Sequence, residues 1–418
     1  MRRTEAVKLT LLIAVLCCAA LGVFLLSSQM TAPVSRPPET VSQPSSLPEP
    51  VEENPDAVVR LRAVGDNLIH DSIYRQAAEY AGGEGFDFGP VYEHVAALVA
   101  DADLSFINQE TIIAERLFPL SGYPLFNTPE ALGEHMVEIG FDLVNVANNH
   151  MFDMGEAGLE AALDFWEEQG VQVFGAWRSE EAMQQPVLTE KNGITIAWVP
   201  MTEHTNGLSL PASTAMRYIR TDERELIRQQ IELAQANADF VIVVPHWGTE
   251  YSLSPNDNQL ELAQWFADLG VDLVLGSHSH TLQPIEWRTG QGGNRTLVVY
   301  SLGNFVGSML YPQNMLGGML DLEITKDGET GEVSITHAGL IPTVIHYEGL
   351  GTHLRVYPFS EYTDELAASH GLVELAASYD VAIAPGSFSM DYMREILDSN
   401  IPEEFRQDSA LKTAEGGK

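Results

Sequence analysis

Two histidines stand two residues apart in the segment GSHSHTLQP, where His278 and His280 follow a mostly apolar run over residues 271–275. Residues two apart in a β-strand point to the same side of the sheet, so a strand leading into this segment would direct both imidazole rings toward one target. Imidazole nitrogens are common ligands of transition metals. The pair therefore indicates a bound metal ion.

Four expected strands share one pattern, in which an aspartate opens the strand and a polar residue follows six or seven positions later. The carboxyl ends of the strands in an α/β sheet are where active sites lie, so these polar residues are expected to meet. The four pairs are Asp103 with Glu110, Asp142 with Asn149, Asp239 with His246, and Asp272 with His278.

Together, the residues at the expected strand ends make a set of metal-binding groups. Two carboxylates, one amide oxygen and several imidazoles suit one divalent transition metal ion, or two ions that share a bridging carboxylate. The set comprises Asp66, Glu110, Asn149, His150, His246, His278 and His280.

Each of these residues also has a plainer explanation when it is taken alone. Asp66 lies between a strand and a helix, where aspartate often caps the helix. The Asn-Asn-His segment at 148–150 is typical of turns. His246 behind an apolar strand resembles a hydrogen-bonded core histidine. The agreement of five separate strand ends favours the metal site over these explanations.

Strand-like and helix-like segments alternate along the chain, which predicts an α/β fold with strands buried between layers of helices. The expected strands cover residues 57–66, 103–110, 142–150, 171–176, 193–200, 239–248, 271–280 and 295–305. The expected helices cover residues 70–82, 91–102, 129–140, 158–170, 222–238 and 257–270.

The character of the chain changes after about residue 310. Residues 317–348 are expected to form a β-hairpin, with a turn at Asp327-Gly328, and a third strand, as outer strands of the same domain. Residues 357–405 are expected to be mainly helices and loops. This gives a core at 57–310, a completing segment at 311–405 and a frayed tail at 406–418.

The N-terminus has the features of a membrane anchor. Arg2, Arg3 and Lys8 precede the apolar stretch Leu9–Leu26, which would span about 27 Å as a helix and so just cross a bilayer. Positive charges before the span predict a single-pass protein of the cell membrane whose C-terminal domain lies outside the cytoplasm. A cleaved signal peptide is the alternative for residues 1–28, although no clear cleavage site follows the run.

Residues 29–56 are rich in Pro, Ser and Glu, which predicts a disordered stalk between the anchor and the folded part. The chain carries 59 acidic and 22 basic residues, a formal charge of −37. Such a balance argues against binding nucleic acid. An anionic substrate would need locally positive charge, such as a bound metal ion.

Six segments together resemble the capsule-synthesis protein A family, which is associated with bacterial poly-γ-glutamate capsules. They are Gly65-Asp66 after the first strand, INQET, ANNHMFDMG, PHWGTEY, GSHSHTLQP and YSLGNF, in the family's order over residues 57–310. The resemblance implies a calcineurin-like metallophosphoesterase fold, a layered β-sandwich flanked by helices. It also implies one or two divalent ions, with manganese, zinc or iron as candidates.

By this resemblance, Glu110 stands where these phosphoesterases have a bridging aspartate, and His150 matches the histidine that contacts the reacting group. The implied metal ligands are Asp66, Glu110, Asn149, His246, His278 and His280. Neighbouring residues that are candidates for contacting substrate or supporting the ligands are Asn67, His70, Asn108, Asn148, Ser301 and Asn304.

The chain departs from the ordinary phosphoesterase pattern at two positions. Leu68 occupies the place of a metal-binding histidine, and His70 would reach the site only if the turn allows it. Glu110 is one methylene longer than aspartate, which shifts the bridging position by about 1 Å. One of two metal positions is therefore expected to be weak or empty.

Three functions fit these residues. The first is a membrane-anchored protein that acts on poly-γ-glutamate or a related anionic capsule polymer in its synthesis, export or attachment, beside membrane synthase subunits. The second is a phosphoesterase for nucleotides or surface phosphoesters. The third is a non-catalytic subunit of a polymer synthase. Trp247, Tyr251 and Phe305 adjoin the motifs and either line a substrate groove or pack in the core.

Overall fold

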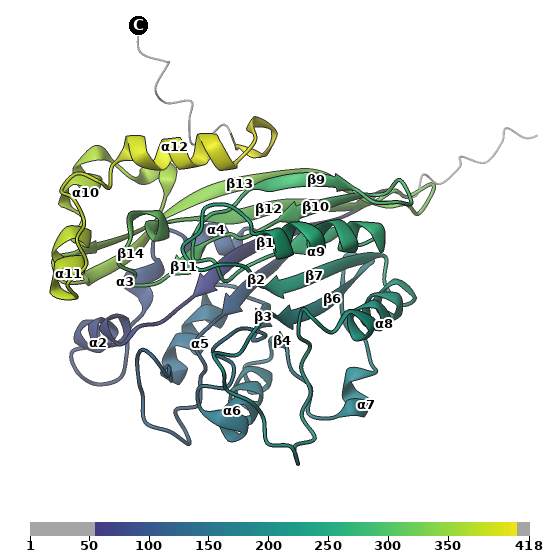
Figure 1. The fold of residues 1–418 in the computed structure, drawn as a ribbon, viewed down its shortest axis with the longest axis horizontal. Helices are drawn as coiled ribbons and strands as arrows, with labels where there is room; N and C mark the ends of the chain where they lie inside the picture. Colours follow the sequence, from purple (N-terminus) through teal and green to yellow (C-terminus); the bar gives the residue numbers. More distant parts are fainter. Residues whose placement is uncertain (1–54, 408–418) are drawn as a thin grey trace, which may run out of the picture. The chain divides into compact units, whose positions relative to one another are not determined.

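The computed structural model describes residues 55–407, which form two facing β-sheets with helices on the outer sides (Figure 1). The larger sheet has the strand order β14-β13-β12-β1-β2-β3-β4, with β11 also paired to β1. Its strands are β1 (Ala57–Asn67), β2 (Leu104–Gln109), β3 (Leu143–Asn145), β4 (Gln172–Phe174), β11 (Asn304–Val306), β12 (Leu316–Lys326), β13 (Val333–Glu348) and β14 (Thr352–Pro358).

The smaller sheet has the order β5-β6-β7-β8-β10-β9. Its strands are β5 (Val187–Lys191), β6 (Ile194–Thr202), β7 (Phe240–His246), β8 (Leu273–Leu275), β9 (Ile285–Thr289) and β10 (Arg295–Val299). The helices are α2 (Asp71–Tyr80), α3 (Gly89–Tyr92), α4 (Ala96–Ala100), α5 (Glu130–Glu138), α6 (Gly155–Glu168), α7 (Glu180–Met183), α8 (Arg224–Gln235), α9 (Asp257–Asp268), α10 (Asp364–Ser369), α11 (Leu372–Ser378) and α12 (Met390–Asn400).

Aromatic rings hold the two sheets together. Trp198 of β6 stacks on Phe106 of β2 and on Phe174 of β4, with ring centroids 5.7 and 5.3 Å apart. Alternate residues of β6 point to opposite sides, so the outward side packs under α8 and α9 in a second apolar cluster. Truncating a buried aromatic ring of this kind costs about 3–5 kcal/mol.

The aspartates that open four strands have a structural role that explains their regular spacing. Each accepts a backbone N–H from the neighbouring parallel strand at 2.8–3.0 Å. Asp142, for example, accepts the N–H of Ser105 in β2, and Asp272 accepts that of Val241 in β7. These contacts align the strands at their amino ends, and the strands then end close together at the opposite edge. The donors to Asp103, Asp142, Asp239 and Asp272 are Arg60, Ser105, Thr195 and Val241.

The prediction of a mixed α/β fold is confirmed, with differences in several elements. The helix expected at 91–102 is broken into α3 and α4, because Val91, Val95 and Leu98 bond to carbonyls three residues back, as in turns. The strands at 187–191 and 285–289 were not expected. They are β5 and β9 at the two edges of the smaller sheet, where half-buried side chains give a weak apolar pattern.

The third C-terminal strand also differs from the prediction. β13 runs unbroken to Glu348, and the third strand is β14, which follows it. Pro342 has no N–H to donate, but it does not end β13. The pairing of β14 with β13 begins only at Thr343, so β14 requires no N–H from Pro342. The anchor expected at 1–28, the stalk at 29–56 and most of the tail at 406–418 lie outside the described residues. Within residues 55–407, no helix combines the length and apolar character that crossing a membrane requires.

Two histidines of the C-terminal part, His346 buried and His370 half-buried, should make stability fall in acid. Burial lowers the pKa of His370 from 6.5 to about 3 and that of His346 to about 4. His370 accepts the N–H of Leu372 and donates to the carbonyl of Ile345, so the fold holds its neutral form. The unfolded chain therefore binds more protons below pH 6.5.

We expect the free energy of unfolding to fall by a few kcal/mol as the pH drops from about 6.5 toward 4, the window between the unfolded and folded pKa values of these histidines. Urea titrations at a series of pH values measure it. A His370→Gln variant should show a shallower dependence on pH in this window. An unchanged slope in that variant would assign the acid sensitivity to other groups.

Candidate metal centre

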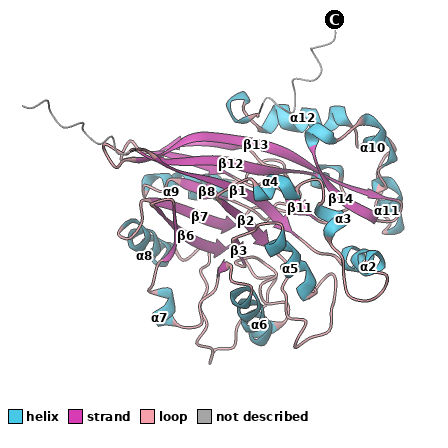
Figure 2. Cartoon of the chain, turned by 180° about the vertical axis from the view of Figure 1, so that it is seen from behind, coloured by secondary structure: helices cyan, strands magenta, loops and turns pink. Residues whose placement is uncertain are grey.

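The predicted ligands meet at one edge of the sandwich, where strands of both sheets end (Figures 1 and 2). Asp66 lies near the end of β1, Glu110 directly follows β2, and Asn149 is in the turn after β3. His246 ends β7, and His278 and His280 follow β8. All six are at most 3% exposed. The site is therefore built by elements far apart in the sequence.

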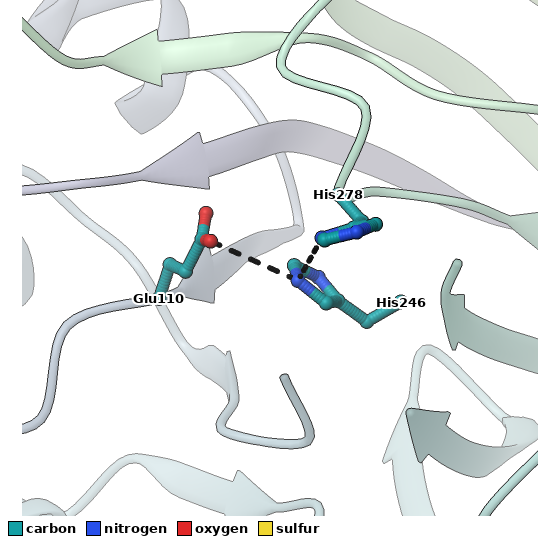
Figure 3. A group of neighbouring side chains, drawn as sticks. All are labelled: Glu110, His246 and His278. Carbon is teal, nitrogen blue, oxygen red and sulfur yellow. Dashed lines mark hydrogen bonds and ion pairs between the residues drawn. The ribbon is translucent and has the colours of Figure 1, made fainter. Parts of the chain in front are cut away.

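Glu110 is the centre of this cluster. Its two carboxylate oxygens are buried and have no hydrogen-bond partner among the described residues. Oε1 lies 3.8 Å from Nε2 of His246 and 3.7 Å from Nε2 of His280. Figure 3 shows the Glu110 carboxylate and the His278 ring both directed toward the same nitrogen of His246. Burial raises the pKa of Glu110 well above its usual range.

Contacts at Nδ1 hold the His246 ring so that its other nitrogen, Nε2, faces the cluster. Its Nδ1 contacts the hydroxyl of Ser277 at 2.9 Å and Nδ2 of Asn108 at 3.4 Å. Nε2 lies 2.8 Å from Oδ1 of Asn149 and 3.1 Å from Nδ1 of His278. Burial lowers the pKa values of His246 and His278 well below the usual range, so both rings are neutral and have a lone pair for a metal.

His278 and His280 converge for a different reason from the one expected. β8 ends at Leu275, and both histidines lie in the following loop with φ values of +96° and +56°. Such backbone is uncommon outside glycine and is frequent at functional sites. Gly276 makes the loop possible, because a Cβ there would lie 2.1 Å from the carbonyl oxygen of Tyr300. The strand expected over 271–280 is therefore wrong after Leu275, where the loop begins.

Asp66 and His280 form the second half of the cluster. Oδ1 of Asp66 accepts Nδ2 of Asn108 at 2.8 Å, and Oδ2 lies 3.3 Å from Nδ1 of His280. Although burial alone would lower it, the carboxylates of Glu110 and Asp66 raise the pKa of His280 to about 10. A buried pair of carboxylates therefore draws a positive charge onto this ring.

The residues present fit divalent metal ions. Three groups of side chains each bring their potential ligand atoms within 4.8 Å of one another, and two of these groups share Glu110. Its two oxygens accept no hydrogen bond among the described residues and so provide the acceptors that a bridging carboxylate needs. The groups are Glu110, His246 and His278; Asp66, Glu110 and His280; and Glu250, His278 and His280.

His150 lies beside the cluster with its orientation fixed. Nδ1 donates to Oδ2 of Asp153 at 2.7 Å, and the same oxygen accepts the N–H of Phe126 at 2.7 Å. The ring packs edge-on against Phe126 with centroids 4.8 Å apart. With Nδ1 engaged, Nε2 is the nitrogen available in the cleft that His150 lines.

The six candidates for supporting roles occupy three kinds of position. Asn108 and Asn304 contact ligands, since Oδ1 of Asn304 lies 3.0 Å from Nδ1 of His280. His70 lines the cleft without joining a group of potential ligands, and its Nδ1 accepts the N–H of Ser308. The other three candidates make local hydrogen bonds instead. The side chain of Asn67 bonds to those of Tyr92 and Gln109, and the side chain of Asn148 bonds to the backbone of Gln109 and His150. The hydroxyl of Ser301 accepts the N–H of Gly303.

Comparison with known proteins identifies the family. Residues 60–309, more than half of the chain, match the bacterial capsule synthesis protein family PGA_cap. The chain belongs to this family. It is 32% identical over 200 residues to the PGA biosynthesis protein CapA of Bacillus subtilis, covering 48% of this chain and 51% of that protein. It is 27% identical over 277 residues to the capsule biosynthesis protein CapA of Bacillus anthracis, covering 62% of each.

The chain thus spans about half to three fifths of the length of these relatives. Among solved structures, the NAD nucleotidase of Haemophilus influenzae aligns with a TM-score of 0.43 and 13% identity, over 82% of this chain and 67% of that one.

In this member of the capsule synthesis family, the segment after β6 adds site residues that the sequence analysis missed. Nε2 of His204 lies 3.2 Å from Nε2 of His278, on the side of the ring away from His246. Nδ2 of Asn206 lies 3.5 Å from the ring nitrogens of His150. The strand was expected to end at residue 200, whereas β6 continues to Thr202. The rule that polar residues follow strand ends would have found His204 had that boundary been placed correctly.

The contact between His204 and His278 predicts a measurable effect on metal affinity. Ligand histidines usually donate their second ring N–H to an acceptor, and removing that acceptor lowers metal affinity about 10- to 100-fold. We expect this loss in His204→Ala, measured by titration of manganese or zinc into the purified full-length chain. The exposed substitution His353→Asn serves as the control and should leave the affinity unchanged. Equal affinity in both variants would show that His204 does not support His278.

The centre opens into a cleft of about 410 Å³. Trp247, Phe305 and Tyr251 were expected either to line a substrate groove or to pack in the core. Trp247 is buried against Phe266 and Tyr300. Phe305 is buried against Tyr92 and Phe141. Tyr251 lines the cleft and is 38% exposed. One aromatic residue of the three is therefore accessible to a substrate.

Proposed function

We propose that this chain is a membrane-anchored, extracytoplasmic protein that acts on poly-γ-glutamate or a related anionic capsule polymer through a metal-dependent hydrolase- or transferase-type site. The family match and the names of the two relatives support the polymer. The apolar stretch Leu9–Leu26 behind three basic residues supports the anchor and the orientation.

The observation that carries the proposal is the state of Glu110. A buried carboxylate whose two oxygens accept no hydrogen bond among the described residues is costly, since a polar group removed from water loses its hydrogen bonds. Such a cost is consistent with a group held for a ligand. The neutral imidazoles of His246 and His278 stand ready on the same side, so the ligand that suits all three is a divalent cation.

Six residues would hold the metal: Asp66, Glu110, Asn149, His246, His278 and His280. When bound, a divalent ion supplies Lewis acidity toward an electrophilic oxygen and lowers the pKa of water to roughly 7. Asn108 and Ser277 fix the rear of His246, and Asn304 fixes His280. The ligands are thereby held in place before substrate arrives, which lowers the cost of reorganisation during the reaction.

His150 is the residue placed to exchange a proton with the reacting group. Asp153 holds Nδ1 and turns Nε2 toward the cleft. The nitrogen can donate a proton to a departing group or a hydrogen bond to a developing negative charge. Neither Lys nor Arg is among the described residues that line the cleft, so an anionic substrate would meet positive charge there only at the metal centre.

Metal content and capsule production together test the proposal. The purified full-length chain should contain bound divalent metal, and His278→Ala should contain much less. Cells that lack the chain should lose polymer and regain it with the wild type but not with His278→Ala, while His353→Asn should restore it. Full restoration by His278→Ala would contradict a role for the metal. Metal-dependent turnover of an aryl phosphate without any change in polymer would instead favour a phosphoesterase.

A further inference from the structure

A second cavity of about 480 Å³ adjoins the cleft of the metal centre. The two share His70, Tyr123, Tyr251 and Met309 in their walls, so they lie directly next to each other. We call the second cavity the tyrosine groove. The tyrosines in its wall are Tyr123, Tyr251, Tyr311 and Tyr379.

Exposed apolar side chains gather along this groove. Of the nine large hydrophobic side chains that are exposed in residues 55–407, six line the tyrosine groove or the adjoining cleft. Tyr123 is 78% exposed and Tyr379 is 66% exposed. Scattered exposure of such residues is ordinary, whereas a concentration at one cavity marks a binding site. The six are Tyr123, Leu125, Tyr251, Tyr311, Leu350 and Tyr379.

Two chains of aromatic contacts connect the groove to the metal centre. Tyr311 contacts Tyr251, and the ring of Tyr251 stacks on His280 with centroids 6.1 Å apart. On the other wall, Tyr123 packs against Phe126, which in turn packs against His150. A molecule held by the tyrosines would therefore extend directly to the residues proposed to do chemistry.

The backbone of Tyr251 is fixed. It has a φ of +66°, a conformation that bulky residues rarely adopt, and its N–H donates to the carbonyl of Ser279 at 2.7 Å. Ser279 lies between the two histidines of the metal centre. The position of the Tyr251 ring is thus coupled to the loop that carries His278 and His280, so groove and centre are built by the same segment.

The charge of the groove excludes an anionic occupant. Among the described residues, its wall contains no Lys or Arg and one acid, Asp71, which is paired with Arg75 at 2.8 Å. His70 is neutral near pH 7, because burial lowers its pKa to about 4. The adjoining cleft adds a further acid, Glu250. A poly-γ-glutamate segment lying in the groove would gain no ion pair with these wall residues, and Glu250 would repel it.

The remaining chemistry is that of an uncharged molecule with flat apolar faces and hydroxyl groups. Tyrosine offers a broad apolar ring with a polar end, and the hydroxyls of Ser72 and Ser308 lie 3.0 Å apart in the wall. Sugar rings match this surface, since they present C–H bonds on their faces and hydroxyls at their rims. We propose that the tyrosine groove binds a neutral glycan chain beside the metal centre.

This inference rests on the proposed function and adds a second substrate class to the same site. The anionic polymer would approach the metal, while the glycan would lie along the tyrosines. The two polymers would then lie next to each other at the side chains that the two cavities share.

Binding of a defined saccharide tests the inference. We expect the purified full-length chain to bind a tetramer of β-1,4-linked N-acetylglucosamine in calorimetry. Tyr123→Ala and Tyr379→Ala should each weaken this binding about two- to tenfold, as expected for an aromatic contact. Both side chains are largely exposed, so the fold should persist. Leu117→Ala, at an exposed position outside the groove, is the matched control and should bind as the wild type does.

The outcomes separate this inference from the proposed function. Glu110→Gln should lose metal and polymer formation and still bind the saccharide through the tyrosines. Absence of saccharide binding while polymer formation remains metal-dependent would overturn only the glycan inference. A γ-linked glutamate oligomer whose binding falls in Tyr123→Ala and Tyr379→Ala would also overturn it, because the groove would then take the anionic polymer.

Discussion

Glu110→Gln is expected to lower metal affinity by more than about 100-fold and to leave the metal-free protein at least as stable as the wild type. Loss of a supporting partner alone costs up to about 100-fold, and Glu110 is the residue that two groups of potential ligands share. Glutamine keeps the size of the side chain and removes a buried charge that accepts no hydrogen bond among the described residues. The ion-pair contacts that it loses, with His246 and His280, are long at 3.8 and 3.7 Å, and Asp66 remains 3.3 Å from His280 to balance the charge of that ring.

Thermal unfolding with and without metal measures both effects at once. The melting temperature of the wild type should rise with added manganese or zinc, because a ligand that binds only the folded state stabilises it by about 2.7 kcal/mol at 100 times its Kd. That rise should vanish in Glu110→Gln. The control is Glu84→Gln, an exposed acid outside the groups of potential ligands, which should keep the rise. An undiminished rise in Glu110→Gln would show that this carboxylate is not a ligand.

The sequence predicts the central strands well, because their character depends on apolar residues buried on both faces. β1, β2, β6 and β7 all lie within one or two residues of expected strands. The edge strands β5 and β9 are half-buried and mix polar with apolar residues, so pattern alone does not separate them from loops. Central strands with buried side chains are thus easier to predict than the strands at the edges of the sheet.

The same physics explains which site residues were found. Residues at the ends of central strands meet because the strands are parallel and aligned, and this needs no knowledge of the loops. The loop after β8 could not be predicted, since its left-handed histidines depend on contacts of Gly276 with β10 and of Ser277 with β7. The pattern also could not separate Asn148 from Asn149, because Asn149 reaches the cluster while the side chain of Asn148 bonds the backbone of the turn.

His150→Ala is expected to lower the rate of polymer formation about 10²- to 10⁴-fold, the usual contribution of a general acid or base. Metal content should remain that of the wild type, because His150 belongs to none of the groups of potential ligands. The measurement is polymer produced per cell over time, with metal analysis of the purified variant. A loss of both rate and metal would instead identify His150 as a ligand.

Asp153→Asn tests whether orientation of that imidazole matters. Asp153 acts through His150 as a positioning residue, since Oδ2 accepts both Nδ1 of His150 and the N–H of Phe126. An amide that turns its NH₂ group toward Nδ1 would favour the other tautomer and place the ring proton on Nε2. We expect a smaller loss of rate than in His150→Ala, partial recovery in Asp153→Glu, and no loss in Asp164→Asn, an exposed acid on α6. If the rate of Asp153→Asn equalled that of the wild type, the fixed Nδ1 contact would be a packing feature and the proton would reach His150 by either nitrogen.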